Sequence, residues 1–340
     1  MNAPLRLRRD RQALAANWRA LARLSGRAAC GAAVKADGYG LGAAWVAETL
    51  AAAGAREFFV ATWAEAAALA PLGLPGLSVL HGVRAEDMAL ALSGIATPVL
   101  NTAAQAARWR AAGGGACHVM LDTGMNRLGL GEGDLAAGAL DGLAIDALMS
   151  HLASADEDSP KNSDQRERFV AMAEGVGAER LSLANSAAIA LGEDYAFDLT
   201  RPGLALYGGV PRPELAGVIA QVAFPQAQVL QRRRVGAGET VGYNATWTAP
   251  ADTDVAILNI GYADGYWRGF SGRGQALHDG EALPVLGRIS MDLTAVDVTK
   301  RAVAEGDWLD IDYDLPRASA ASGMSQYELL TGLGGRFERA

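Results

Sequence analysis

Residues 32–42, AAVKADGYGLG, begin the stretch of sequence that decides the fold. A short apolar run ends on a lysine, a glycine-rich turn follows, and an Ala- and Leu-rich segment with helical spacing comes next. From residue 28 to about residue 208, short apolar runs keep alternating with amphipathic stretches. This rhythm predicts repeated strand and helix units.

The number of candidate strands predicts the architecture of this region. Eight strands that alternate with helices indicate a TIM-like (β/α)₈ barrel of the α/β class rather than an open doubly wound sheet. Two of the intervening helices are expected at 41–53 and 163–175, with glycine near their ends. The strands are expected at 29–36, 57–62, 77–82, 97–101, 118–122, 145–151, 181–185 and 198–203.

The C-terminal third differs from the preceding part in its pattern of apolar and polar residues. After residue 213, β-rich runs such as 223–230, 254–260 and 308–311 are separated by glycine and aspartate. We therefore expect the barrel to occupy residues 1–218 and a smaller, mostly β domain to occupy residues 219–340. A long linker between them is not expected, so the two domains should pack closely.

Bulk properties restrict the class of protein. The chain has 340 residues, half of them hydrophobic, and a net charge of −8, which argues against nucleic acid or an anionic membrane as partner. Apolar runs stay short of the roughly 20 residues that span a bilayer. The basic N-terminus lacks the apolar region of a secretory signal, so we expect a cytoplasmic protein. Cys30 and Cys117 lie in apolar segments and are predicted to be reduced core residues, not metal ligands.

Polar side chains stand where the predicted barrel strands end. In barrels of this kind, catalytic groups come from the carboxyl ends of the strands. We therefore expect these side chains to surround one site. Lys35 ends the first strand, Asn101 the fourth and His151 the sixth, Arg127 follows the fifth, Asn185 and Ser186 follow the seventh, and Arg201 lies in the eighth.

Lys35 is the candidate for covalent chemistry. A lysine in an apolar strand must be paired, lose its proton or be consumed covalently, and the last option includes Schiff-base formation. Taken alone, such a lysine is more often a snorkelling or salt-bridged side chain. The glycine-rich turn at 37–42 adds a backbone that can approach a ligand and the phenol of Tyr39. It lacks the GxGxxG spacing of dinucleotide-binding folds.

At this point the sequence resembles a known family, the alanine racemases, which are fold-type III pyridoxal-phosphate enzymes. The resemblance covers nearly the whole chain, in collinear order. It rests on AVKADGYGLG around Lys35, LDTGMNRLG at 121–129, SHLASAD at 150–156, ANSAA at 184–188, RPGLALYG at 201–208, VGYNATW at 241–247, IGYADGY at 260–266, GRISMD at 287–292 and YELL at 327–330.

The resemblance implies a homodimer that racemises a small amino acid by two opposed bases. Lys35 would form the Schiff base and act as one base, and Tyr243 from the partner subunit would be the other. Two bases on opposite faces are what inversion at the α-carbon requires. Arg201 would face the pyridine nitrogen and favour reprotonation over other reactions. His151 would link that arginine to the tyrosine.

The remaining site residues follow from the same resemblance. Cofactor binding would involve Asn185, and the substrate carboxylate would be held by Arg127 and the Met291 N–H. The phosphate would be held by Tyr39, Ser186, the backbone at Gly203 and Leu204, and Tyr327. The entrance would be formed by Tyr262 and Asp292, with Arg288 and Asp156 further out. No metal is implied.

Two departures from the family pattern stand out. Many members place a carbamylated lysine, which orients the arginine, where this chain has Met120. Methionine cannot carry a carbamate, so an ion, water or a polar group must serve Arg127 instead. The chain also ends on GGRFERA and lacks the tyrosine that many relatives carry there, for which we expect little effect.

The leading prediction is interconversion of L- and D-alanine with pyridoxal phosphate, either to supply D-alanine as a peptidoglycan precursor or for alanine catabolism. A racemase that also accepts serine or basic amino acids is the nearest alternative, since Met120 and the entrance residues leave specificity open. A non-catalytic cofactor carrier would not need Tyr243, Tyr262 and Met291. A decarboxylase of this fold type would need a carboxylate in place of Arg201.

Overall fold

The computed structural model describes residues 3–339, which form two compact units. The barrel unit comprises Gln12–Ala220, and the β unit combines Gln221 and the residues after it with the N-terminal residues up to Arg11. The N-terminal segment belongs to the β unit because β1 (Leu5–Arg9) pairs antiparallel with β11 (Ala223–Val235). The predicted domain 1–218 thus differs from the barrel unit at its N-terminal end.

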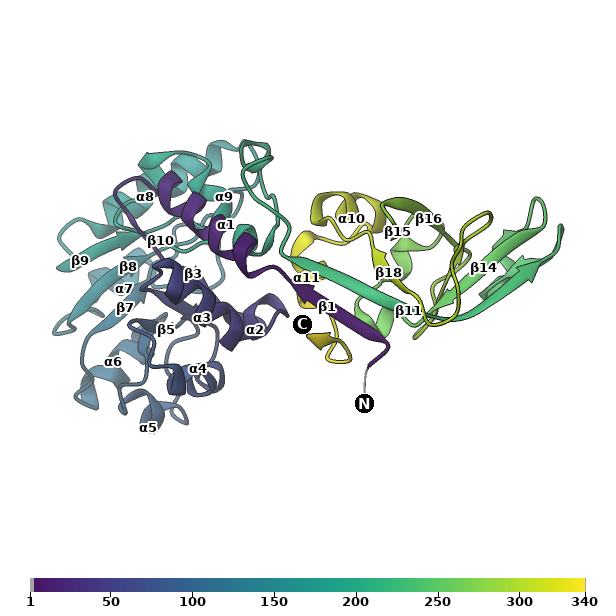
Figure 1. The fold of residues 1–340 in the computed structure, drawn as a ribbon. Coiled ribbons are helices and arrows are strands. Elements are labelled where there is room, and N and C mark those ends of the chain that lie inside the picture. The colour runs from purple at the N-terminus through teal and green to yellow at the C-terminus, as the bar shows by residue number, and fades with distance from the viewer. Residues whose placement is uncertain (1–2, 340) are drawn as a thin grey trace. The chain divides into compact units, whose positions relative to one another are not determined.

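The barrel unit contains the eight parallel strands that the sequence predicts. This part of the chain is coloured purple to teal in Figure 1. Its first strand is split at Gly31 into β2 and β3, and β10 pairs with β2 while β3 pairs with β4. The backbone bond from Arg201 N to Ala184 O, at 2.8 Å, joins the eighth strand to the end of the seventh. The barrel class is confirmed. Its strands are β2 (Ala29–Cys30), β3 (Ala32–Ala33), β4 (Phe58–Val60), β5 (Leu77–Val79), β6 (Thr97–Leu100), β7 (Cys117–Met120), β8 (Ile145–Met149), β9 (Ala178–Ser182) and β10 (Leu199–Thr200).

Helices follow most of the strands, and their ends match local signals. Thr62 and Glu65 form a capping box at the start of α4, and Ser159 caps α8, which has proline in its first turn. The predicted helix at 41–53 is α3, and the one at 163–175 is α8. The helices are α1 (Arg11–Leu24), α2 (Lys35–Tyr39), α3 (Ala43–Ala53), α4 (Trp63–Leu69), α5 (Met88–Ala91), α6 (Ala103–Ala111), α7 (Glu132–Ala136), α8 (Pro160–Ala173) and α9 (Ser186–Ile189), with 3₁₀ turns η1 (Ala70–Leu72), η2 (Glu193–Tyr195), η3 (Leu204–Tyr207) and η4 (Pro213–Leu215).

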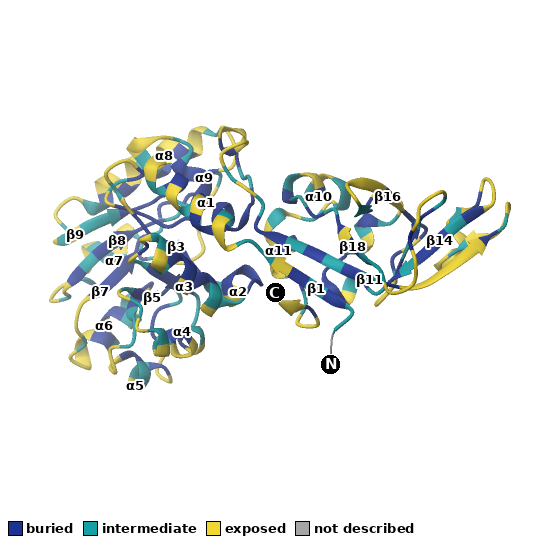
Figure 2. Ribbon diagram, viewed as in Figure 1, coloured by how far each residue is buried: buried dark blue, intermediate teal, exposed yellow. Residues whose placement is uncertain are grey.

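The barrel interior is apolar around Met120 and polar around His118, two residues earlier on β7. Figure 2 shows β7 and β8 in dark blue, and one buried cluster joins Phe59, Val99, Met120, Ala147, Met149 and Leu199. A polar network lies at the level of His118, which is hydrogen-bonded to Ser78 Oγ at 3.1 Å and lies 3.5 Å from Asp146. Arg180 then joins Asp146 to Glu57 by ion pairs of 2.6 and 2.8 Å. Burial lowers the pKa of His118 to about 4, although Asp146 opposes the shift.

The β unit is a mostly antiparallel sheet, as predicted for the C-terminal domain. The strand order is β14-β17-β16-β15-β18-β11-β1-β19, and β14 also pairs with β11. The further strands are β12 (Thr240–Val241), β13 (Trp247–Thr248), β14 (Thr253–Leu258), β15 (Gln275–His278), β16 (Glu281–Leu286), β17 (Thr294–Asp297), β18 (Trp308–Ile311) and β19 (Glu338–Arg339). Helices α10 (Leu315–Ser322) and α11 (Gln326–Thr331) and 3₁₀ turns η5 (Tyr243–Ala245), η6 (Tyr262–Asp264) and η7 (Arg268–Phe270) complete it.

The two cysteines are buried and free, as the sequence predicts. Burial raises the pKa of Cys30 to about 11 and that of Cys117 to about 12, so both thiols stay protonated at neutral pH. In the described part of the chain, no helix combines the length and the apolar character that a membrane crossing requires.

Candidate active site

Lys35 follows β3 directly, in a turn whose backbone is unusual. The next residues, Ala36, Asp37 and Tyr39, have φ angles of 53°, 53° and 54°, a left-handed conformation that is costly for residues with a Cβ. The turn is tied down from outside, because Ala36 N donates to Glu65 Oε1 at 2.6 Å. Asp37 Oδ1 also accepts from Ala43 N at 2.8 Å. The surrounding structure therefore holds Lys35 in a set position at the carboxyl end of the first strand.

The surroundings of Lys35 favour its neutral amine. Burial is the largest cause that lowers the pKa of Lys35, and the charges of Arg127 and Arg201 lower it further, while Glu65 opposes them. A lysine that loses its proton more readily is a better nucleophile and a better base. The charges of Arg127 and Arg201 would also attract an anionic ligand.

Arg201 is a buried cation with fixed partners. Its side chain is 7% exposed, and its guanidinium donates to Ser182 Oγ and, at 2.6 Å, to the Ser150 carbonyl oxygen. Burial lowers the pKa of Arg201 to about 10, so the group remains protonated at neutral pH. Since neither partner carries a charge, Arg201 retains its full charge for another group nearby.

His151 lies near these cations and is neutral. Burial lowers its pKa to about 3, and the charges of Arg201, Arg127 and Lys35 act in the same direction. A neutral imidazole can accept a hydrogen bond as well as donate one. The structure thus brings together Lys35, Arg127, His151 and Arg201, which the sequence places at four different strand ends.

A small cradle lies beside Tyr39 in the barrel unit. A Cβ at Gly203 would lie 2.2 Å from Tyr39 Oη, so the glycine allows the phenol to approach the backbone closely. Tyr39 stacks on Tyr207 at 4.5 Å, and the Tyr207 hydroxyl donates to Ala33 O at 2.7 Å, which fixes both rings. Ser186 Oγ accepts from Gly203 N and Ala205 N at 2.9 and 3.1 Å. The Ser186 hydroxyl, the Tyr39 phenol and the start of η3 thus lie together, and groups of this kind fit the phosphate of pyridoxal phosphate.

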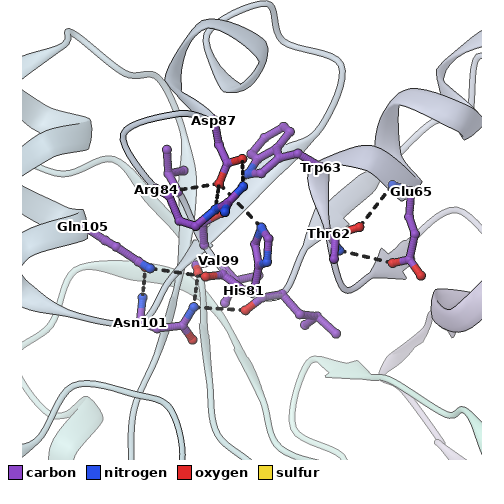
Figure 3. A network of polar contacts seen from close by, with 12 residues as sticks. Thr62, Trp63, Glu65, His81, Arg84, Asp87, Val99, Asn101 and Gln105 are labelled. Atoms are coloured by element: carbon purple, nitrogen blue, oxygen red, sulfur yellow. Dashed lines mark hydrogen bonds and ion pairs between the residues drawn. The ribbon is translucent and has the colours of Figure 1, made fainter.

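Two predicted strand-end residues have structural roles in this fold. Asn185 Oδ1 caps α9 by accepting from Ala188 N at 2.9 Å. Asn101 donates from Nδ2 to Leu80 O and Val99 O and belongs to the network with Gln105, His81, Arg84 and Asp87 that Figure 3 shows. Both residues therefore shape the carboxyl end of the barrel.

Arg127, Asp156 and Met120 complete the predicted residues of the barrel unit. Arg127 is exposed in the loop after β7, and Asp156 is exposed after β8. Met120 is 9% exposed within the apolar barrel core. A buried thioether among hydrocarbon side chains offers Arg127 no charged partner, in agreement with the departure seen in the sequence.

The predicted residues of the β unit, apart from Tyr327, line one pocket of about 470 Å³. They come from three separate sequence runs, and Tyr243 and Met291 are 64% and 53% exposed in the single chain. Tyr327, on α11, is also exposed. The pocket is lined by Tyr243, Asn244, Tyr262, Arg268, Arg288, Met291 and Asp292.

Sequence reasoning missed two residues that shape these sites. Arg268 lies 5.0 Å from the Tyr262 ring, a cation–π contact within the same pocket. Glu65 holds the backbone after Lys35, and its signal was the capping-box pattern Thr62-x-x-Glu65. This local pattern predicts that a helix starts at Thr62, but it does not predict the bond from Ala36 N to Glu65.

Comparison with known proteins covers the whole chain. The model of the alanine racemase N-terminal domain matches residues 9–211, and that of the C-terminal domain matches residues 222–340. The alanine racemase of Acidiphilium cryptum is 44% identical, covering 100% of this chain and 99% of the relative. The biosynthetic alanine racemase of Agrobacterium fabrum is 40% identical over 99% of this chain and 93% of its own.

Solved structures agree with these relatives. The alanine racemase of Bartonella henselae, with covalently bound pyridoxal phosphate, has a TM-score of 0.91 at 33% identity, covering 99% of each chain. The biosynthetic alanine racemase of Pseudomonas aeruginosa has a TM-score of 0.91 at 31% identity over 100% of this chain and 99% of that one. With both domain models matched in order and relatives at 40–44% identity over nearly their whole length, this chain is a member of the alanine racemase family.

Proposed function

We propose that this protein interconverts L-alanine and D-alanine with pyridoxal phosphate. One observation carries the proposal: Lys35, with its pKa lowered by burial, is held by a left-handed turn within the field of Arg127 and Arg201. An amine that is held in place and loses its proton readily can attack an aldehyde, and the neighbouring cations attract an aldehyde that carries a phosphate, as pyridoxal phosphate does.

The cofactor assignment is supported by the cradle at Gly203 and by the covalently bound pyridoxal phosphate of the Bartonella henselae relative. When bound, this cofactor withdraws electrons from the substrate α-carbon and makes the α-hydrogen acidic. Lys35 would hold it covalently. Tyr39, Ser186, the backbone at Gly203 and Leu204, and Tyr327 would hold its phosphate, and Asn185 would shape the pocket by capping α9.

The two bases are Lys35 and Tyr243. Lys35 would remove or return a proton on one face of the α-carbon, and Tyr243 would do so on the other face. We assign Tyr243 to the site of a second copy of the chain, because Tyr243, Met291 and Leu293 are large exposed residues of the β unit that a partner would cover. The barrel domain would then bind the cofactor, and the C-terminal domain would complete the partner's site.

Arg201 and His151 would set the course of the reaction. The Arg201 cation, facing the pyridine nitrogen, would keep that nitrogen unprotonated, which favours return of the proton over loss of the carboxylate. His151, neutral because of its low pKa, would connect Arg201 to the partner's catalytic tyrosine by accepting from one and donating to the other.

Substrate selection is assigned to the pocket of the β unit and to two residues of the barrel unit. The Met291 N–H and Arg127 would hold the carboxylate of the amino acid. Tyr262 and Asp292 would form the inner entrance, with Arg288 and Asp156 further out. A narrow entrance would admit alanine better than longer side chains, since an apolar pocket alone separates one methylene by only about 1–3 kcal/mol.

A broader amino-acid racemase remains the alternative, and the observation that favours it is at Met120. This residue is buried in hydrocarbon, and Arg127 is exposed, so the carboxylate site is less constrained than one with a charged partner. Serine and basic amino acids would then also react.

The deciding experiment is a kinetic comparison on the purified, cofactor-loaded protein. We expect racemisation of L- and D-alanine, measured by chiral chromatography, with kcat/KM at least about tenfold above that for serine, lysine and arginine. Similar values for all four would favour the broader racemase. Absence of alanine racemisation would overturn the proposal. In this scheme the product D-alanine would supply peptidoglycan synthesis, and a cytoplasmic location stays a prediction.

A further inference from the structure

Arg336, in the C-terminal segment after α11, connects two loops of the β unit. Its Nε donates to Asp264 Oδ1 at 2.7 Å, and its Nη1 donates to Asp292 Oδ1 at 2.7 Å. Asp264 ends the turn η6 that begins at Tyr262, and Asp292 follows Met291. One guanidinium therefore bridges the loop at 261–265 and the loop at 290–293.

The first partner of Arg336 is a fully buried carboxylate. Asp264 is 0% exposed, and its other oxygen, Oδ2, accepts from Gly261 N at 3.0 Å. A buried carboxylate needs a cation and hydrogen-bond donors to remain ionised. Gly334 N also donates to the Asp264 carbonyl at 3.3 Å, so the segment that carries Arg336 is anchored on the same residue.

The two loops are also joined directly, backbone to backbone. Tyr262 N donates to Ser290 O at 3.1 Å, and Ala263 N donates to Met291 O at 3.0 Å. The contact is so close that a Cβ at Gly261 would lie 2.3 Å from Met291 O. These bonds hold the two loops against each other.

This contact sets the direction of the Met291 N–H. The Ser290 carbonyl and the Met291 N–H belong to the same peptide group, in which C=O and N–H point in opposite directions. Holding Ser290 O against Tyr262 N consequently aims the Met291 N–H away from that loop. Asp292, clamped by Arg336, is the next residue along the chain.

We propose that Arg336 is a positioning residue for the substrate-binding loop, which it holds in register with the entrance loop by bridging Asp264 and Asp292. The proposal rests on the function proposed above for Met291, Tyr262 and Asp292. Arginine suits this place because its planar guanidinium presents several donors to two carboxylates at once, whereas a lysine ammonium acts as a single point charge.

The test compares Arg336→Ala and Arg336→Lys with Arg317→Ala as matched control. Arg317 is also an arginine of the β unit beside two aspartates, Asp312 at 2.9 Å and Asp314 at 3.8 Å, but it lies on α10, outside both loops. The first measurement is amide hydrogen exchange of segments 261–265 and 290–293 in the protein without cofactor. The second is KM and kcat for both alanine enantiomers, together with inhibition by acetate, a carboxylate without an amine.

We expect Arg336→Ala to speed exchange of the Tyr262 and Ala263 amides by about tenfold or more, because their acceptors lie in the released loop. KM for both enantiomers and the inhibition constant of acetate should rise by about tenfold, with a smaller change in kcat. Arg336→Lys keeps a charge for buried Asp264 and should show the same direction with a smaller effect. Arg317→Ala should match the wild type.

Three outcomes would overturn the positioning role. If exchange at 261–265 in Arg336→Ala stays at the wild-type rate, Arg336 does not hold the two loops together. If exchange is faster while KM and acetate inhibition are unchanged, the bridge is structural and does not position the substrate-binding loop. If Arg336→Ala does not fold, Arg336→Lys decides, and its identity with the wild type in both measurements would end the proposal. If the wild type itself does not racemise alanine, the proposed function fails, while hydrogen exchange still tests the clamp.

Discussion

Lys35 and Tyr243, the two proposed bases, lie in contrasting surroundings. Lys35 follows a barrel strand in a turn bound to Glu65, and burial lowers its pKa. Tyr243 is 64% exposed in a 3₁₀ turn of the β unit. The first base is thus prepared within its own unit, whereas the second still offers its side chain to solvent. We infer that a mutation at the first position affects local structure as well as chemistry, whereas one at the second acts through assembly and chemistry alone.

The same contrast extends to the neighbours of each base. Around Lys35, rings and backbone fix each other, as in the stack of Tyr39 on Tyr207. Around Tyr243, the pocket is formed by loops, and side-chain bridges such as that of Arg336 hold those loops. A barrel positions groups by its strands, while a loop cluster depends on a few charged contacts.

The largest expected effect is that of Lys35→Ala. We expect racemisation to fall by at least about 10⁴-fold, because the covalent anchor and one base are lost together. Borohydride reduction followed by peptide mass spectrometry should find the cofactor on the Lys35 peptide of the wild type. The exposed Lys161, replaced by alanine, is the control and should retain activity. A Lys35→Ala enzyme with full activity would refute the assignment.

Tyr243→Phe should have the next largest effect and sharpens the comparison. We expect kcat/KM to fall by roughly 10²–10³-fold, while the free energy of unfolding changes by less than about 0.5 kcal/mol because the side chain is exposed within its own chain. In D₂O, the enantiomer whose α-hydrogen faces Lys35 should still exchange deuterium, and the other should not. Equal or negligible effects on the two enantiomers would contradict the two-base scheme.

Acid should destabilise the barrel unit through His118. The unfolded chain binds a proton there below the ordinary pKa of 6.5, whereas the folded chain does so only below about 4. The stabilising contribution of neutral His118 is therefore complete above pH 6.5 and is lost as the pH falls towards 4, up to about 3 kcal/mol. His118→Gln should flatten the dependence of unfolding free energy on pH in denaturant titrations. His278→Gln, in the β unit, is the control, and an unchanged slope for His118→Gln would disprove this account.

The smallest effect is expected for Gly203→Ala, which tests whether the barrel side is rigid. The new Cβ would meet Tyr39 Oη at 2.2 Å and push the phenol away from the cradle. We expect a loss of about 1–2 kcal/mol in stability and about tenfold weaker cofactor binding, measured by thermal unfolding and by cofactor titration. Gly177→Ala, where the Cβ would meet nothing within 4 Å, provides the matched control. Wild-type cofactor affinity in Gly203→Ala would show that the cradle adapts.

Local patterns predicted most of the fold and much of the site. The eight strands and the change to β-rich runs could be read from periodicity, which neighbouring residues express together. The grouping of Lys35, His151, Arg127 and Arg201 followed from the rule that parallel strands end on one face of a barrel. The predicted roles of these residues, and of Tyr243, remain predictions that the experiments above address.

Contacts between distant segments could not be read in this way. The bond of Ala36 to Glu65 spans 29 residues, and that of Arg336 to Asp264 spans 72. Likewise, the residues of β1 do not indicate which unit the strand belongs to. Its pairing with β11 places it in the β unit. The low pKa of His118 arises from the burial that the whole barrel creates.

The sequence by itself therefore determined the order of strands, the glycine-rich turn after Lys35 and the residue types at the strand ends, because these depend on neighbours along the chain. The tertiary structure decided which of those residues lie together, which are buried and which cations share a field. Burial and electrostatic interactions depend on the distances between residues in space, and those distances are fixed only when the chain has folded.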